Sequence, residues 1–523
     1  MEDNTQTPHP EISTKEKWLI TSAIMMGTLM GIITASIINV ALPHMRGSLG
    51  ASVEEIAWVS TGFLLSSVIV MPIIAMLSAR FGRKNFLIFA ISLFTTASIF
   101  CGLAWNLNTL IFFRIVQGIG GGALIPIAMA VLRETFPPKE QAQAMSIFGL
   151  GVMLGPAFAP TLGGWITDNY SWRWCFYINV PFGILAIYLI MKYIEDPPYL
   201  IREKGKIDFP GLFSLAVGLG SFQIMLERGQ RENWLSSTFI QYLAAIAFLG
   251  LVFFIWRELT TDKPAVNLRI LKDLNFASGT ALGSLLNMGL MGGMFILPLF
   301  LQQLLGYTAR DSGIALLPRS LAMAIAMSLG GSLYNHLGPK PLVGGGLVVC
   351  FFSSYWLSRL SLDVGYWDIF TAQFLQGIGF GFLFVSLSTA SLSTIQLPMM
   401  TAATGLHNVI RQMFGSIGIA MSATFLSRSE SVFRRILLEN VSIFKNVTND
   451  RLRLFAAYLF QRGFDQTTAE NKALKIIQTI VMRQSTMLSY NRVFFLVALL
   501  FILAIPFVFT LRDDRLADFK KKK

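Results

Sequence analysis

Charged residues are scarce in this sequence. Of its 523 residues only 14% are Asp, Glu, Lys or Arg, whereas 54% are hydrophobic and the mean hydropathy is +0.59. Soluble domains carry about 25% charged residues, and a soluble chain of this length would need a polar shell around each of its domains. The composition therefore excludes a water-soluble enzyme and indicates that the apolar excess faces lipid.

Residues that build catalytic and metal centres are also few. The three cysteines, at positions 101, 175 and 350, have the spacing of neither a disulfide framework nor a metal site. The four histidines, at positions 9, 44, 336 and 407, are scattered, and no nucleophile lies beside a base. We therefore expect no metal, no cofactor and no enzymatic activity, and a membrane enzyme or sensor is the weakest alternative.

Nucleotide-binding signatures are missing as well. No Walker A sequence occurs, so this chain is not expected to hydrolyse ATP. The glycine-rich residues 118–122 lie inside an apolar run with no strand before them, which favours close helix packing over a dinucleotide site. Any pumping must draw on an ion gradient or on a partner ATPase.

Long apolar runs dominate what is present. A helix needs about 20 apolar residues to cross the hydrocarbon layer, and these runs lack the alternation of barrel strands. We predict an all-α polytopic membrane protein with fourteen transmembrane helices. The expected spans are 18–42, 53–76, 86–105, 109–131, 142–166, 175–194, 210–227, 238–256, 276–300, 312–334, 341–358, 367–393, 402–426 and 490–511.

The net charge of +13 follows the predicted topology. Most lysines and arginines of the short connecting segments fall on one side of the membrane, which predicts that both termini are cytoplasmic. We expect attraction to anionic membrane lipid and no nucleic-acid partner. The first 17 residues contain acidic side chains and precede an apolar run of about 25 residues, so Trp18 is expected to begin a retained span.

An internal repeat divides the chain. Residues 117–122 (QGIGGG) in the fourth span reappear as 376–381 (QGIGFG) in the twelfth. An offset of eight spans is expected when two helices are inserted between two six-helix bundles, a design that secondary transporters use. The predicted organisation is a tail (1–17), a bundle (18–194), a linker with spans 7 and 8 (195–275), a second bundle (276–511) and a basic tail (512–523).

A polar insertion, residues 427–489, separates the last two spans on the predicted outer face of the membrane. Thr467 and Glu470 have the spacing of a capping box that opens an amphipathic helix. Two interpretations stay open. The insertion is either a helical hairpin on the membrane surface or a docking site for a partner protein.

Several motifs together resemble a known family. They are residues 39–43 (NVALP), 114–118 (RIVQG), 172–174 (WRW), 179–183 (NVPFG) and 223–229 (QIMLERG), with Gly155, Pro156, Pro160, Gly163 and Gly164 in the fifth span. The chain resembles the major facilitator superfamily, its fourteen-span drug:proton antiporter branch and, within that branch, the EmrB-like pumps of the bacterial inner membrane.

The resemblance implies export of hydrophobic small molecules by alternating access, coupled to proton influx. It also implies an EmrA-like periplasmic adaptor and an outer-membrane channel as partners. The alternative is a dedicated exporter of one metabolite, such as a siderophore or a fatty acid, or an uncoupled uniporter.

Two motifs carry roles that the resemblance implies. The glycines and prolines of the fifth span should let it bend and pack closely, and in the antiporters this motif is thought to limit leak. Arg80, Gly82, Arg83 and Lys84 match a cytoplasmic latch, but Ala79 replaces its usual Asp. The latch is therefore weaker, or takes its acid from elsewhere, or is a simple positive-inside loop.

Polar residues inside the spans are the remaining site candidates. The antiporters carry an Asp in the first span where this chain has Thr34, so the proton carrier is not identified. Candidates for proton coupling or gating are Arg114, His407, Arg411, Glu227 and Asp311, and candidates for the substrate cavity are Thr34, Asn39, Gln117, Gln373, Gln376, Asn408 and Arg319. Buried arginines must face the protein interior. We therefore expect an electropositive cavity that favours apolar anions or neutral amphiphiles over lipophilic cations.

Overall fold

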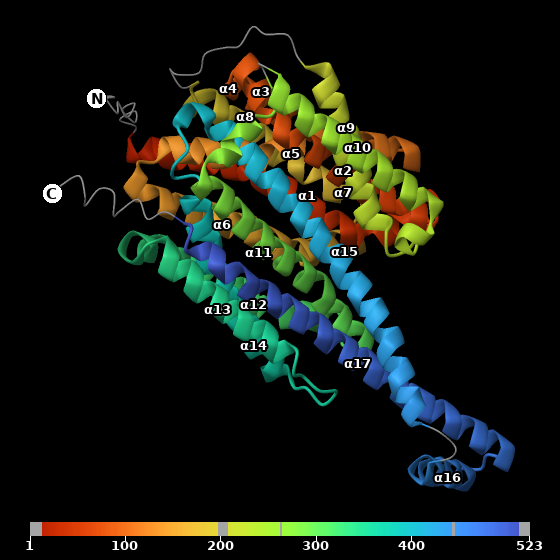
Figure 1. The fold of residues 1–523 in the computed structure, drawn as a ribbon. Coiled ribbons are helices and arrows are strands. Elements are labelled where there is room, and N and C mark those ends of the chain that lie inside the picture. Colours follow the sequence, from red (N-terminus) through yellow and green to blue (C-terminus); the bar gives the residue numbers. More distant parts are fainter. Residues whose placement is uncertain (1–12, 197–207, 262–263, 442–444, 512–523) are drawn as a thin grey trace.

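The computed structural model describes residues 13–196, 208–261, 264–441 and 445–511. Every regular element in these ranges is a helix, as predicted (Figure 1). The helices are α1 (Thr14–Leu49), α2 (Val53–Val70), α3 (Ile74–Phe81), α4 (Arg83–Leu103), α5 (Leu107–Thr135), α6 (Pro138–Asn169), α7 (Trp174–Tyr177), α8 (Asn179–Tyr193), α9 (Phe209–Arg228), α10 (Thr238–Thr260), α11 (Leu274–Leu299), α12 (Ala309–Leu337), α13 (Pro339–Leu357), α14 (Tyr366–Ala390), α15 (Met400–Asn440), α16 (Asn446–Gln461) and α17 (Gln466–Val508).

Thirteen helical segments of the described residues are long and apolar enough to cross a membrane. Two of them are interrupted: a 3-10 turn, Met71–Ile73, joins α2 to α3, and α7 runs into α8. The remaining predicted span is α6, whose 32 residues extend about 48 Å and can cross a layer of about 30 Å. The fold class predicted from the apolar runs agrees with this arrangement.

Both ends of the described chain lie at one end of the molecule, which we call the terminal end. Three contacts tie this end together: Lys17 Nζ to Glu140 Oε2 (2.9 Å), Asn335 Nδ2 to the Lys139 carbonyl (2.9 Å) and Lys340 Nζ to the Phe509 carbonyl (3.1 Å). They join the start of α1 to α6, α6 to α12, and α13 to the segment after α17. Because the described chain begins and ends at the same end of the molecule, it crosses the membrane an even number of times.

The repeated glycines make equivalent contacts in the two bundles. Gly118 and Gly122 of α5 face α2, and Gly120 faces α4; in the same way Gly377 and Gly381 of α14 face α12, and Gly379 faces α13. A Cβ at Gly120 would stand 2.6 Å from the Ala90 carbonyl oxygen, and one at Gly379 would stand 2.9 Å from the Gly346 carbonyl oxygen. The sequence repeat is therefore a repeat of helix packing.

The inserted helices α9 and α10 form a hairpin, which we call the inserted hairpin, beside the junction of the two bundles. Its helices approach closely at Gly218 and Gly250, where a Cβ on either residue would come within 2.9 Å of the other helix backbone. Helix α9 packs against α2 of the first bundle and α15 of the second, whereas few residues of α10 are buried. The hairpin thus flanks the seam between α2 and α15.

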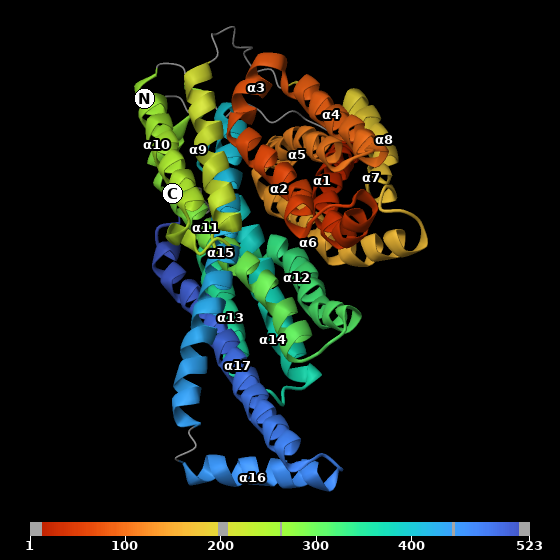
Figure 2. The same ribbon diagram turned by 90° about the vertical axis from the view of Figure 1, so that its right-hand side faces the viewer.

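The predicted insertion between the last two spans is an extension of those spans. Helix α15 continues to Asn440, α17 already begins at Gln466, and α16 runs across their tips (Figure 2). We call the described residues 427–441 and 445–489 the arm, and the end of the molecule that carries it the arm end. Because 14 helical residues span about 21 Å, α16 lies roughly that far beyond the predicted end of the thirteenth span. The insertion is therefore continuous with α15 and α17, and only α16 crosses their axes.

The predicted capping box of the arm is wrong by two residues. Asp465, not Thr467, caps α17, and its carboxylate accepts a hydrogen bond from the Thr468 backbone N–H at 3.0 Å. Glu470 instead accepts a hydrogen bond from Gln466 on the same helix (3.3 Å). Hydrogen bonds from the Thr468 side chain and from its backbone N–H lower the pKa of Asp465, because they stabilise the carboxylate.

Candidate functional site

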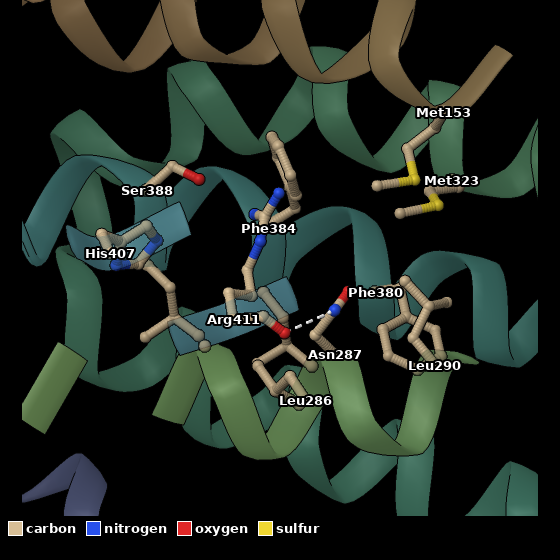
Figure 3. Close-up of a pocket in the computed structure, with 13 residues that line it drawn as sticks. Met153, Leu286, Asn287, Leu290, Met323, Phe380, Phe384, Ser388, His407 and Arg411 are labelled. Atoms are coloured by element: carbon tan, nitrogen blue, oxygen red, sulfur yellow. Dashed lines mark hydrogen bonds between the residues drawn. The ribbon is translucent and has the colours of Figure 1, made fainter. Parts of the chain in front are cut away.

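A small cavity lies inside the second bundle where it faces α6 of the first (Figure 3). Residues of α6, α11, α12, α14 and α15 line it, and most of them are Met, Leu or Phe. Met153 of α6 and Met323 of α12 meet on one side, and Phe384 of α14 lies between them and α15. The cavity measures about 40 Å³, room for a few water molecules.

Helix α15 brings the two predicted candidates His407 and Arg411 into this cavity, because residues four apart share a helix face. His407 is 1% exposed, and its Nδ1 lies 3.1 Å from the Thr280 hydroxyl of α11. Arg411 places its guanidinium carbon 5.4 Å from the centre of the Phe384 ring. Asn287 Nδ2 donates to the Arg411 carbonyl at 2.8 Å and closes the floor of the cavity.

Asn408 points out of the cavity, although it neighbours His407 in sequence. Its amide donates to the Thr404 carbonyl (2.8 Å) and contacts Met129 Sδ of the first bundle (3.2 Å). The predicted polar cluster of α15 is therefore split. His407 and Arg411 line the cavity, whereas Asn408 joins the two bundles.

Arg114 lies in the core of the first bundle, 1% exposed. Its Nε donates to the Val59 carbonyl of α2 (2.9 Å), and its Nη1 donates to Gln117 (2.7 Å). Gln117 in turn donates to Ser98 of α4 (2.6 Å), and the Phe63 ring lies 4.3 Å from the guanidinium carbon. The cation is thus held by a carbonyl, an amide and an aromatic face.

The second bundle has a related cluster in which the cation sits on the other helix. Gln376 of α14 donates to Ser354 of α13 (3.2 Å), as Gln117 does to Ser98. Arg319 of α12 is 6% exposed and lies 5.3 Å from the Phe380 ring, which lines the cavity. In the described part of the chain, Arg319 Nη2 and both side-chain polar atoms of Gln373 lack a hydrogen-bond partner.

Arg411, which lines the cavity, and Arg319, which contacts its wall at Phe380, are both cations. None of the ion pairs between described residues involves Arg114, Arg319 or Arg411. No group of three or more His, Cys, Asp or Glu in the described ranges is placed to hold a metal ion. The geometry is therefore that of an apolar cavity beside uncompensated cations.

Three candidates lie elsewhere. Thr34 is buried and its hydroxyl lies 3.0 Å from Asn179 Oδ1 of α8, so this position belongs to the core of the first bundle. Asn39 is exposed and accepts a hydrogen bond from Ser60 at 3.0 Å. Asp311, also exposed, accepts one from Thr308 at the start of α12 (2.7 Å).

Glu227, another coupling candidate outside the cavity, lies in the last turn of α9 and accepts a hydrogen bond from Thr61 of α2 at 2.5 Å. It is the one candidate that the inserted hairpin contributes.

The glycines of the fifth span bring α6 against α1. A Cβ at Gly155 would stand 2.9 Å from an Ile32 methyl, and one at Gly163 would stand 3.2 Å from the Ile37 carbonyl oxygen. Gly164 has open space instead. Pro156 lies in the same unbroken helix, and the side chain of Pro160 lies outside the described residues.

The latch motif takes its acid from elsewhere in the chain, one of the alternatives left open by the sequence. Arg83, at the start of α4, forms an ion pair with Glu134 at the end of α5. Its Nη2 also donates to Thr401 at the start of α15 (3.0 Å). Since α4 and α15 belong to different bundles, Arg83 holds the two bundles together at the terminal end.

The other latch residues contribute at the same place. Gly82 adopts φ = 86°, a left-handed conformation that favours glycine, and turns the chain between α3 and α4. The Lys84 backbone N–H donates to Asp196 at 2.8 Å, and Lys84 Nζ donates to the Met191 carbonyl at 2.7 Å. Arg80 lies in the last turn of α3. A second link between the bundles, from Arg133 Nη1 to the Thr389 carbonyl (3.1 Å), lies nearby.

Arg83→Ala should open the terminal end. A hydrogen bond from a charged group is worth about 1.5–3 kcal/mol, or about ten- to a hundredfold in a population ratio. Spin labels on cysteines introduced at positions 139 and 337 measure the distance between the two bundles, because both positions are exposed and one lies in each bundle. The native cysteines are buried, so they should add little background label.

We expect a longer label distance in Arg83→Ala and an unchanged one in Lys15→Ala, which removes an exposed cation at the same end. Equal distances in both variants and the parent would show that Arg83 does not hold the bundles together.

Most cavity residues were not predicted. Met153, Met323, Phe380 and Phe384 are apolar residues in apolar spans, and the sequence does not distinguish those that face lipid from those that face a cavity. Asn287 could have been predicted as a site residue, because it is a polar residue in the middle of the ninth span, where unpaired polar groups are costly.

Comparison with known proteins agrees with this architecture. The profile of the Major Facilitator Superfamily matches residues 24–419. The chain is 32% identical to the multidrug export protein EmrB of Escherichia coli K12 over 495 residues, which cover 94% of each chain. It is 31% identical to the fatty acid resistance protein FarB of Neisseria gonorrhoeae, covering 94% of this chain and 95% of that protein.

Solved structures share the fold at low sequence identity. The human organic anion transporter MFSD10 superposes with a TM-score of 0.60 at 12% identity, covering 93% of this chain and 99% of that one. The proton:xylose symporter XylE superposes with a TM-score of 0.57 at 14% identity, covering 95% and 97%.

Proposed function

Because this chain belongs to the major facilitator superfamily, we propose that it exports hydrophobic small molecules, in exchange for protons, by alternating access between its two six-helix bundles. The multidrug export proteins that it resembles over nearly its whole length support this function. The bundles pivot about a site between them, and the inserted hairpin flanks their seam.

The observation that carries the proposal is the apolar cavity around His407 and Arg411, at the face where the second bundle meets α6. Substrate sites of transporters built from two repeats lie at the repeat interface. A cavity of about 40 Å³ is far below the roughly 300–1,000 Å³ of small-molecule sites. Substrate binding therefore requires that the bundles separate here.

The terminal end is cytoplasmic in this proposal, as the distribution of basic residues predicts, and the arm end is periplasmic. With Arg83 bound to Thr401 and Arg133 bound to the Thr389 carbonyl, the cytoplasmic gate is closed. Proton entry from the periplasm drives the step that opens it. The membrane is the inner membrane of a bacterium.

The cavity charge sets the preferred substrates. Arg411 lines the cavity and Arg319 lies behind Phe380, with no acidic partner for either cation among the described ion pairs. The positive potential of these arginines favours the binding of anionic or neutral amphiphiles over the binding of lipophilic cations. Export of a single metabolite such as a fatty acid is the second candidate, which the likeness to a fatty acid resistance protein favours.

Proteoliposomes with an imposed pH step test the function. We expect the step to drive efflux of an anionic dye and of dodecanoate, and no such response would contradict proton coupling. Response to dodecanoate alone would favour the second candidate.

Binding of two ions of equal shape tests the cavity charge. We expect the purified protein to bind tetraphenylborate at least about tenfold more tightly than tetraphenylphosphonium, which corresponds to about 1.4 kcal/mol. Tighter binding of the cation would contradict the electropositive cavity.

We further propose that the arm binds a periplasmic adaptor, which connects the pump to an outer-membrane channel. The arm projects beyond the membrane and exposes large apolar side chains, such as Val447 and Leu454, each 69% exposed. Exposed apolar surface of this kind marks interaction sites.

A further inference from the structure

The carboxylate of Glu227 lies where the inserted hairpin meets the first bundle. Glu227 belongs to the last turn of α9, and its Oε1 accepts a hydrogen bond from the Thr61 hydroxyl at 2.5 Å. Thr61 is eight residues, about 12 Å, from the arm end of α2, so the contact lies about two helical turns inside that end of the first bundle, and Glu227 itself is exposed. The proton site expected in α1 is occupied by Thr34, which cannot carry a proton through the cycle.

The Thr61 hydroxyl stands between two acceptors. Its oxygen lies 3.2 Å from the Ala57 carbonyl oxygen and 2.5 Å from Glu227 Oε1. A hydroxyl has one proton and can donate to only one of them. When Glu227 is ionised, Thr61 donates to it; when Glu227 is protonated, the carboxylic acid donates to Thr61 Oγ1, and Thr61 donates to Ala57. Both protonation states are thus hydrogen-bonded, but the bond to the ionised carboxylate is charge-assisted and is the stronger of the two, so protonation loosens the contact between α9 and α2.

The charged groups around this contact have other partners or stand in the open. On α2, Glu54 pairs with Arg231 (3.4 Å) and Glu55 caps the helix through Ser52. Arg228, the next residue on α9, places its guanidinium over the Trp58 ring of α2 at 4.9 Å. Glu232, in the loop after α9, and Arg428 of α15 are exposed. The hydrogen-bond partner of the Glu227 carboxylate is therefore the neutral hydroxyl of Thr61, and Arg228 acts on the carboxylate through its charge alone.

The same hairpin also contacts the second bundle. The Trp234 indole N–H donates to the Thr424 hydroxyl of α15 at 2.9 Å. Asn233 and Trp234 hold left-handed backbone angles, with φ of 55° and 52°, a conformation that is unfavourable for residues other than glycine. The loop is strained in the position that aims Trp234 at α15. The hairpin thus ties α2 to α15 at the arm end, and its contacts with one of these two helices must give way when the bundles pivot.

We propose that Glu227 binds a proton during transport and that the inserted hairpin passes its protonation state to the gate at the arm end. The inference rests on the proposed function, proton-coupled export. A proton from the periplasm converts the Glu227 carboxylate to the acid, which reverses the hydrogen bond to Thr61. The hydrogen bond between Glu227 of the hairpin and Thr61 of the first bundle is therefore altered, whereas the hydrogen bond from Trp234 to Thr424 still holds the hairpin to the second bundle.

Efflux of an anionic dye from proteoliposomes, with and without a pH step, tests the inference. The parent protein should respond to the step. Glu227→Gln keeps the size of the side chain and removes the titratable group. Downhill efflux should therefore be retained, whereas the acceleration of efflux by the pH step should fall at least about tenfold, which corresponds to about 1.4 kcal/mol of coupling.

Three further variants separate proton binding from structure. Glu227→Asp keeps an acid and should retain the response, Thr61→Val should shift the midpoint of the pH profile, and the control Glu232→Gln, on the exposed loop, should match the parent. A full response to the pH step in Glu227→Gln would overturn the inference and leave the proposed function standing. Lack of a response in the parent would overturn the proposed function itself.

Discussion

Arg114→Ala should abolish transport and lower the thermal stability of the purified protein. The substitution leaves the Val59 carbonyl and the Gln117 amide oxygen without their donor, in a core where Arg114 is 1% exposed. A buried acceptor left unpaired costs about 1–3 kcal/mol, and the vacated space beside the Phe63 ring adds the cost of a cavity. Dye efflux from proteoliposomes and thermal unfolding in detergent measure the two effects separately.

Arg114→Lys distinguishes charge from geometry. Lysine keeps the cation but cannot donate in two directions from one plane, so a partial recovery of stability with little recovery of transport is expected. Arg310→Ala is the control, since it removes an exposed arginine at the start of α12. Normal efflux by a well-folded Arg114→Ala protein would show that this cation has no part in transport.

The spans could be predicted because the hydrocarbon layer imposes their length and composition. Their ends could not, since hydropathy reports only the part of a helix that lies in lipid. The first span was expected at 18–42, whereas α1 runs from Thr14 to Leu49 and begins at a capping box formed by Ser13 and Glu16. In the same way the polarity of the residues after position 426 predicts a separate insertion, whereas these residues continue α15 without a break.

The site was predictable only where a residue type is rare in its setting. His407, Arg411 and Arg114 stood out because charged or titratable side chains inside spans are costly. The acid of the latch, Glu134, did not stand out, because it lies 51 residues from Arg83 in sequence and meets it only when α4 packs on α5. The apolar wall of the cavity gave no signal, since helix rotation decides whether a Phe or Met faces lipid or its neighbours.

Removing the outer part of the arm should abolish drug resistance in cells without abolishing transport by the purified protein. The Thr486 hydroxyl donates to Glu430 at 3.0 Å, so α15 and α17 are adjacent at this level and a short Gly-Ser linker can replace residues 434–482. The deletion leaves both bundles and the cavity in place. Thermal unfolding and dye efflux should therefore match the parent, and only the contact with a periplasmic partner should be lost.

A milder variant tests the same surface without shortening the chain. Val447, Leu454 and Tyr458 of α16 are 69%, 69% and 51% exposed, and spacings of seven and eleven residues place them within about 20° of one helix face. Replacing all three by serine should reduce resistance as the deletion does, whereas replacing the exposed Lys475 of α17 should not. Full resistance in cells that express the shortened arm would mean that the pump needs no partner at this surface, because an exporter that delivers its substrate into the periplasm alone requires only the two bundles.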